Sequence, residues 1–101
     1  MLLDSILLNK DDIINIFKRH GASNITIVGS VARRQEHDAS DIDFVADLKR
    51  YKDGTIDLQA HTDLVRELAT YFERKIHLTS YEQILSFPPS DALKEGVVLD
   101  R

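Results

Sequence analysis

A short apolar run that ends at a glycine is the feature that most constrains the fold of this sequence. Residues 24–28 read Asn-Ile-Thr-Ile-Val, and Gly29 and Ser30 follow at once. β-Branched residues favour extended backbone, so we expect a buried strand that stops at Gly29, where the chain can turn sharply. The composition from Ser30 to Arg34 favours a helical turn. Its unpaired N–H groups and the Ser30 hydroxyl would face the end of the strand, where a phosphate is the natural occupant.

A pair of aspartates lies ten residues further on, at the start of a second predicted strand. Residues 41–43 read Asp-Ile-Asp, and the apolar residues 44–46 follow. Because side chains alternate along a strand, Asp41 and Asp43 share one face and the apolar side chains share the other. Mg²⁺ prefers oxygen ligands and is usually held by one or two carboxylates together with substrate phosphates. We therefore predict a magnesium site at Asp41 and Asp43.

The segment that joins these two features, residues 33–40, is polar and loop-like. Such a connection is expected to bring two strand ends to one cleft. Arg33 or Arg34 would add a phosphate contact, although most surface arginines have no such role. A Gly-Ser pair or an Asp-x-Asp pair is common and weakly informative by itself. In this order and context, the two together indicate transfer of a nucleotidyl group.

Two segments of the chain resemble the signature of the minimal nucleotidyltransferases, small members of the DNA polymerase β superfamily. They are Gly-Ser-Val-Ala-Arg at residues 29–33 and Ser-Asp-Ile-Asp-Phe-Val at residues 40–45. The resemblance covers most of the chain and implies an α/β (α+β) fold, a small mixed β-sheet flanked by helices. The residues that it implies for the site are Gly29, Ser30, Arg33 and Ser40 as nucleotide-binding, with Asp41 and Asp43 as catalytic and metal-binding.

The resemblance also implies a biological role and its partners. Many minimal nucleotidyltransferases are antitoxins that silence a HEPN-domain ribonuclease toxin by transferring AMP from ATP to a toxin tyrosine. We therefore expect ATP as substrate, Mg²⁺ as cofactor and a cognate HEPN toxin as partner in a hetero-oligomer. A more distant alternative is a nucleotidyltransferase of small molecules such as aminoglycosides, but those enzymes normally carry a further domain for the acceptor.

Two positions depart from the family pattern. Arg34 stands where glycine is usual, and the change looks tolerable for the loop. The third strand of the family commonly carries another aspartate, whereas residues 75–79 here read Lys-Ile-His-Leu-Thr. Alternation places Ile76 and Leu78 toward the core and directs His77 to the cleft of the two aspartates. His77 is therefore the third candidate catalytic residue.

Three interpretations of His77 remain open from the sequence. Histidine exchanges protons near neutral pH, so His77 is a candidate general base in an active enzyme. Imidazole is a poor ligand for Mg²⁺, so the missing carboxylate would instead leave an antitoxin that neutralises its toxin by binding alone. The third interpretation is a surface histidine without a role. A fold-back of Asp57 as a substitute carboxylate is disfavoured by its distance from the strands.

Composition limits the remaining possibilities. A chain of 101 residues with 43% hydrophobic content is expected to form one minimal nucleotidyltransferase domain over residues 1–101. It has no cysteine, which excludes thiol catalysis and cysteine-ligated zinc. The net charge of −4 argues against direct nucleic-acid binding and suits a basic partner. The apolar start is broken by Asp4 and matches neither a secretion signal nor a membrane span, so we expect no membrane partner and a cytoplasmic location.

The remaining patterns predict scaffold. One helix is expected from Asn9, as its N-cap, to a stop at Gly21. Another is expected over residues 62–74, between the second and third strands. Ser80 and Gln83 form a predicted capping box for a short helix through Ser86, which Pro88 and Pro89 end, and residues 90–95 are expected to form a further helical turn. The apolar residues 97–99 are expected to cover an edge of the sheet, with docking into a partner as the alternative.

Overall fold

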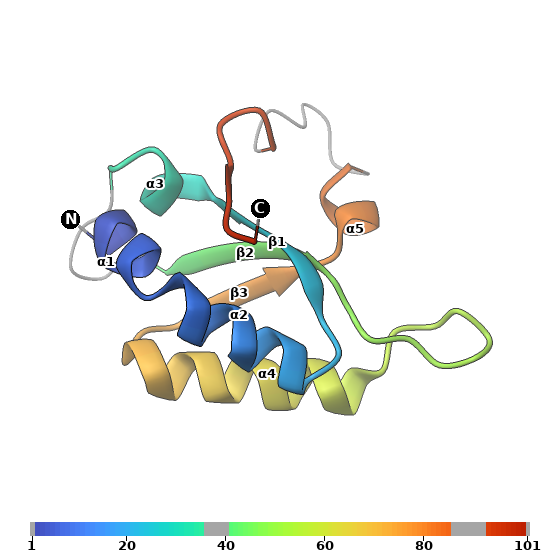
Figure 1. Cartoon of the computed structure of the whole chain (residues 1–101). Coiled ribbons are helices and arrows are strands. Elements are labelled where there is room, and N and C mark those ends of the chain that lie inside the picture. The colour runs from blue at the N-terminus through green and yellow to red at the C-terminus, as the bar shows by residue number, and fades with distance from the viewer. Residues whose placement is uncertain (1, 36–40, 86–92, 101) are drawn as a thin grey trace.

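The computed structural model describes residues 2–35, 41–85 and 93–100. Helices and strands alternate along most of this chain (Figure 1). In order, the elements are α1 (Leu2–Leu8), α2 (Lys10–Arg19), β1 (Ser23–Val28), α3 (Gly29–Ala32), β2 (Ile42–Asp47), α4 (Leu58–Phe72), β3 (Ile76–Thr79), α5 (Tyr81–Leu85) and β4 (Val97–Val98).

The four strands form one mixed sheet in the order β3-β2-β1-β4. Strand β1 pairs antiparallel with β2 and with β4, whereas β2 and β3 run parallel. The predicted small mixed sheet is therefore confirmed. The apolar C-terminal residues cover an edge of this sheet, as the favoured interpretation expected, because Val97 pairs with Ile27 and the Leu99 side chain is buried.

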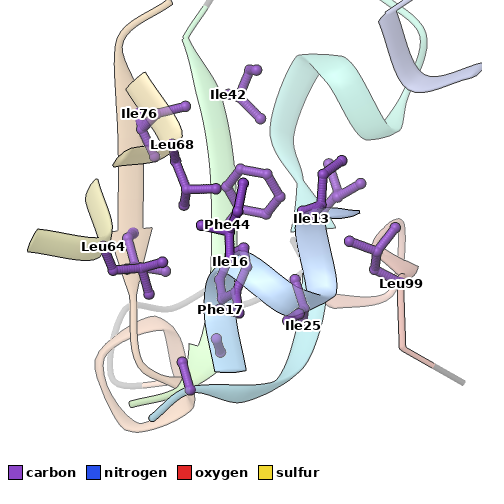
Figure 2. Packing of buried hydrophobic residues seen from close by; sticks show 14 of the residues in the cluster. Ile13, Ile16, Phe17, Ile25, Ile42, Phe44, Leu64, Leu68, Ile76 and Leu99 are labelled. Carbon is purple, nitrogen blue, oxygen red and sulfur yellow. The ribbon is translucent and has the colours of Figure 1, made fainter. Parts of the chain in front are cut away.

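Helices α2 and α4 lie side by side against one face of the sheet (Figure 1). The main core fills the space between these helices and the strands, and Figure 2 shows side chains from both layers gathered around Phe44. The Phe44 ring meets the Phe17 ring edge-on at 5.3 Å between centroids. Ile42 and Ile76 point to the same layer and are buried. Alternation therefore leaves Asp43 and His77 on the opposite face, which is the face that carries the site.

The N-terminal helices differ in part from the expectation. Helix α1 was not predicted, and it buries Leu3 and Ile6. Helix α2 begins directly after Asn9 as expected, but Asn9 provides no side-chain cap. The side-chain amide nitrogen of Asn9 instead donates to the Ser5 carbonyl of the preceding helix α1, at 2.8 Å. Gly21 follows the end of α2 with a φ of 74°, a conformation that favours glycine.

Helix α4 begins at Leu58, four residues before the expected start. The reason is Asp57, whose carboxylate accepts a hydrogen bond from the Ala60 amide at 3.0 Å and caps the helix. Asp57 is thus committed to a helix end rather than to the site of the two aspartates. No helix in the described part of the chain is long and apolar enough to cross a membrane.

The capping box at α5 is confirmed. The backbone amide of Gln83 donates to Ser80 Oγ at 3.2 Å, and the backbone amide of Ser80 donates to Gln83 Oε1 at 3.0 Å. The described part of α5 ends at Leu85. The expected end at Ser86, the turn at Pro88 and Pro89 and the start of the 90–95 turn lie outside the described residues.

Candidate active site

Three neighbouring strands bring their side chains into one row on the open face of the sheet. Val28 at the end of β1 pairs with Asp43 in β2, and Asp43 pairs with His77 in β3. Paired residues point to the same face, so Asp43 and His77 are direct neighbours. Asp41 directly precedes β2, two positions before Asp43, and its carboxylate also reaches the His77 ring. The prediction that His77 faces the cleft of the two aspartates is therefore correct in geometry.

The His77 ring lies between the two carboxylates. Its Nε2 is 3.3 Å from Asp41 Oδ2, and its Nδ1 is 3.1 Å from Asp43 Oδ1. A neutral imidazole carries one N–H, whereas the protonated ring carries two. Only the protonated ring can donate to both carboxylates at once. His77 thus bridges the two carboxylates and is not an isolated surface histidine.

Burial and the neighbouring charges act in opposite directions on the Asp43 carboxylate. Burial raises the pKa of Asp43 above its ordinary value of 3.8, while the charge of His77 and a hydrogen bond from it act in the opposite direction. The Asp41 carboxylate adds a smaller contribution that also raises the pKa of Asp43. The cationic ring therefore offsets part of the cost of holding two acidic groups together.

The Gly29 turn touches this pair directly. Gly29 has a φ of 73°, and a Cβ atom built there would collide with Asp43 Oδ2. A side chain at this position would therefore meet both backbone strain and a carboxylate. The predicted meeting of the glycine turn with the aspartates is borne out by this contact, since ten intervening residues separate Ser30 from Asp41 in the sequence.

The predicted helical turn is present but shorter than expected. Helix α3 spans only Gly29–Ala32, and Val28 before it brings no capping side chain. Ser30 lies in its first turn, beside the row of site residues. The helix stops because Arg34 adopts a φ of 58°, the left-handed conformation that favours glycine. This backbone angle explains why glycine suits the position that Arg34 occupies.

The two arginines after α3 are engaged with carboxylates. Arg33 Nη1 lies 3.4 Å from Glu95 Oε2, and its charge also acts to lower the pKa of Asp43. Arg34 Nη1 lies 2.7 Å from a carboxylate oxygen of Asp4 in α1. Arg33 therefore stays near the site, whereas Arg34 anchors α1. Ser40, the fourth predicted nucleotide-binding residue, lies outside the described residues.

The sequence of this chain matches a known family over the same elements. The family is Polymerase beta, Nucleotidyltransferase, and the match runs over residues 11–100. The chain belongs to this family. The resemblance to minimal nucleotidyltransferases is thereby confirmed, along with the polymerase β-like nucleotidyltransferase fold. A search among curated proteins found none that matches the chain.

Solved structures share the fold of this nucleotidyltransferase. A protein described as a minimal nucleotidyltransferase superposes with a TM-score of 0.72 at 21% identity, over 94% of this chain and 93% of that one. A toxin–antitoxin crystal structure with AMP-PNP gives a TM-score of 0.66 at 23% identity, over 90% of this chain and 72% of the other. A mutant of the toxin–antitoxin MntA–HpeT gives a TM-score of 0.68 at 20% identity, over 90% of this chain and 72% of the other.

The carboxylates of this nucleotidyltransferase fit a divalent cation in part. Oxygens of Asp41 and Asp43 approach the two nitrogens of the same His77 ring, and about a third of each side chain is exposed (31% and 33%). Within residues 2–35, 41–85 and 93–100, no group of three His, Asp or Glu side chains forms a complete metal site. Two hard ligands with open solvent access suit Mg²⁺, which completes its coordination with water and phosphate oxygens.

A pocket that the sequence did not predict lies beside the row of Val28, Asp43 and His77, called the catalytic row below for its proposed role. It has a volume of about 290 Å³ and is lined by residues that include Val28, Asp43, His77, Thr79 and Ile84. Thr79 lies two positions after His77 in β3 and therefore on the same face. The placement of α5 over the sheet gave no sequence signal. The surface of the pocket is largely apolar, and its polar lining residues are Asp43, His77, Thr79 and Gln83.

Proposed function

We propose that this nucleotidyltransferase is an antitoxin that transfers AMP from ATP to a hydroxyl, a tyrosine in the favoured interpretation, of a cognate HEPN ribonuclease toxin. The observation that carries the proposal is the contact between the Gly29 turn and Asp43, with Asp41 alongside. It brings a turn suited to phosphate against a pair of magnesium ligands. The fold shared with a toxin–antitoxin structure that contains AMP-PNP supports both the nucleotide and the partner.

Each site residue has a defined role in this proposal. The backbone amides at Gly29 and Ser30, with the Ser30 hydroxyl, bind the β- and γ-phosphates. Arg33 adds positive charge near the phosphates, and Ser40 is retained as a nucleotide contact from the sequence. Asp41 and Asp43 would hold Mg²⁺, which neutralises phosphate charge when bound.

One bond forms in this reaction and another breaks. The acceptor oxygen bonds to the α-phosphorus of ATP, and the bond from that phosphorus to the bridging oxygen of the β-phosphate breaks, which releases pyrophosphate. The acceptor proton passes to a ring nitrogen of His77. Both nitrogens face carboxylates, at 3.3 Å and 3.1 Å. For His77 to serve as base, the ring must therefore be neutral, and the contact at its unprotonated nitrogen must open.

The position of His77 also favours a second candidate function. Its ring lies against the oxygen atoms of Asp41 and Asp43 that a cation would need. A stable cationic bridge would stand in for the metal and leave the protein without transfer activity. In that case the antitoxin neutralises its toxin by covering the toxin active site.

A labelling experiment separates the two candidates. The protein is mixed with its partner toxin, Mg²⁺ and ATP labelled at the α-phosphate, and label on the toxin is followed together with ribonuclease activity. The enzyme proposal expects labelled, inactive toxin with wild type, and neither label nor silencing with Asp41→Asn plus Asp43→Asn. Silencing without label, retained in the double variant, supports neutralisation by binding. An aminoglycoside offered in place of the toxin tests the small-molecule alternative and is expected to stay unlabelled.

Variants of His77 test its assignment as base. His77→Ala is expected to slow labelling, and an undiminished rate would show that the base lies elsewhere. His77→Asp restores the carboxylate of the family pattern. It is expected to raise the rate if metal binding was limiting, and a further fall in rate would assign His77 to proton transfer.

A further inference from the structure

The pocket beside the catalytic row has walls from three different elements. Val28 comes from the end of β1, Thr79 from β3, and Ile84 from α5. Asp43 and His77 lie at the same pocket, so any group bound in it touches the proposed reaction centre. The pocket therefore belongs to a substrate, and its chemistry indicates which one.

Helix α5 is held firmly over the sheet. The Tyr81 hydroxyl donates to the Asn24 carbonyl, and with its single proton used there it accepts from Thr26 Oγ1 at 2.8 Å. The capping box at Ser80 fixes the start of the helix. Arg50 Nη2 also lies 2.6 Å from Glu82 Oε1. The Ile84 wall is thus positioned in advance of binding, which reduces the entropic cost of ordering a ligand.

The order of the strands gives the site a direction. The proposed phosphate turn follows β1 at Gly29, the carboxylates lie on β2, and His77 lies on β3. In phosphoryl transfer the attacking and leaving oxygens are roughly in line. With pyrophosphate leaving toward Gly29, the attacking hydroxyl must approach from the β3 side. The pocket spans the row from Gly29 and Val28 to His77 and Thr79. With the phosphates at Gly29, the end of the pocket at His77 and Thr79 is the one left for the acceptor.

The lining favours an apolar ring over a nucleobase. Adenine carries several ring nitrogens and an amino group, and burying them without partners is costly. Val28 and Ile84 offer no hydrogen bond, and the Gln83 side-chain oxygen accepts from the Ser80 amide in the capping box. The Thr79 hydroxyl is a single polar group against the several that adenine carries. A phenol needs only one polar contact, at the hydroxyl that reacts. A serine hydroxyl would leave the apolar walls uncovered.

We propose that this pocket binds the acceptor side chain and selects an aromatic hydroxyl, with Ile84 and Thr79 as specificity-determining residues. The inference rests on the proposed function, because it assumes an acceptor that receives AMP. It goes further in naming where the acceptor binds and why a phenol is chosen.

Binding is tested without turnover by nuclear magnetic resonance of the ¹⁵N-labelled full chain. The probes are p-cresol, which copies the tyrosine side chain, and adenosine. We expect p-cresol at millimolar concentration to shift the amides of Thr79 and Ile84. Ile84→Ser should weaken p-cresol about fivefold by removing apolar contact, whereas Ile84→Leu should stay within about twofold of wild type. Unchanged amide dispersion elsewhere in each variant shows that it is folded.

The outcomes separate this inference from the proposed function. Adenosine that shifts the same amides and displaces p-cresol would assign the pocket to the nucleobase and overturn the inference. Failure of p-cresol to bind at Thr79 and Ile84 would also overturn it, even if the toxin is labelled by ATP. Binding of p-cresol as expected, combined with no label on the toxin, would uphold the pocket and contradict the enzyme proposal instead.

Discussion

Asp43 Oδ2 occupies the space in which a side chain at Gly29 would begin. The two residues lie on different elements, and the contact presses the backbone of the turn against a carboxylate. Two features favour glycine there: its φ of 73°, and the lack of room for a Cβ atom beside Asp43. This contact joins the two halves of the proposed site.

Gly29→Ala is expected to destabilise the fold by about 2–3 kcal/mol, through backbone strain and the collision with Asp43. Gly54→Ala is the matched control, because Gly54 also has a positive φ, of 90°, but no atom within 4 Å of a new Cβ. It should cost only about 1 kcal/mol. Urea unfolding measures both. Equal losses in the two variants would show that the Asp43 contact adds nothing.

Arg34→Gly is expected to change stability in the opposite direction from Arg34→Ala. Arg34 has a φ of 58°, so glycine relieves about 1 kcal/mol of strain. Both variants lose the exposed ion pair with Asp4, which contributes at most about 1 kcal/mol. The difference between glycine and alanine therefore reports the backbone alone. Thermal unfolding should place the glycine variant above the alanine variant, and the reverse order would be inconsistent with a left-handed Arg34.

Asp43→Asn is expected to make the protein more stable at pH 7. Burial raises the pKa of Asp43 in the folded protein above 3.8, so the folded state binds this proton more tightly than the unfolded state. The contribution of Asp43 therefore favours folding below about pH 3.8 and is lost as pH rises through the folded pKa. Removing the charge should thus raise the free energy of unfolding at pH 7 and change it less at pH 4.

The control for this pH dependence is Asp57→Ala. A hydrogen bond from the Ala60 amide lowers the pKa of Asp57, so its contribution is present at pH 7 and is lost as pH falls below 3.8. Unfolding in urea at pH 7 and pH 4 compares the two variants. An Asp43→Asn protein that is less stable than wild type at pH 7 would mean that attraction to His77 outweighs burial.

Tyr81→Phe tests the attachment of α5 to the sheet. The lost hydroxyl bonds to the Asn24 carbonyl and to Thr26, so we expect a loss of about 1–2 kcal/mol. Tyr51→Phe is the control, because the more exposed Tyr51 makes one long hydroxyl contact of 3.2 Å to Asp57. Its loss should stay below about 0.5 kcal/mol. Similar losses in both variants, by urea unfolding, would argue against the anchoring of α5.

Much of the site was predictable because strands have a strict two-residue period. Alternation was enough to place Asp41 and Asp43 on one face and His77 beside them, as the pairing of Asp43 with His77 bears out. The Gly29 turn was predictable from the abrupt end of an apolar run. The roles of these residues in binding ATP and magnesium stay predictions.

Other features depend on tertiary contacts that the sequence pattern does not encode. Whether Arg34 takes a left-handed φ is decided by how the chain leaves α3, since its residue type favours no such angle. The start of α4 was misplaced because its apolar stripe begins only at Leu64, whereas the cap at Asp57 starts the helix at Leu58. The pocket at Ile84 depends on contacts that hold α5 over the sheet, such as the hydrogen bond from Tyr81 to the Asn24 carbonyl of β1, between residues far apart in the chain.

In the proposed function, Mg²⁺ and ATP meet at Asp41 and Asp43 beside the Gly29 turn. Isothermal titration of ATP into the protein, with and without Mg²⁺, tests it without a partner. We predict that Mg²⁺ tightens ATP binding by about tenfold or more in wild type, and that Asp41→Asn plus Asp43→Asn removes this gain. ATP affinity that is the same with and without Mg²⁺, or a gain that survives in the double variant, would contradict the account.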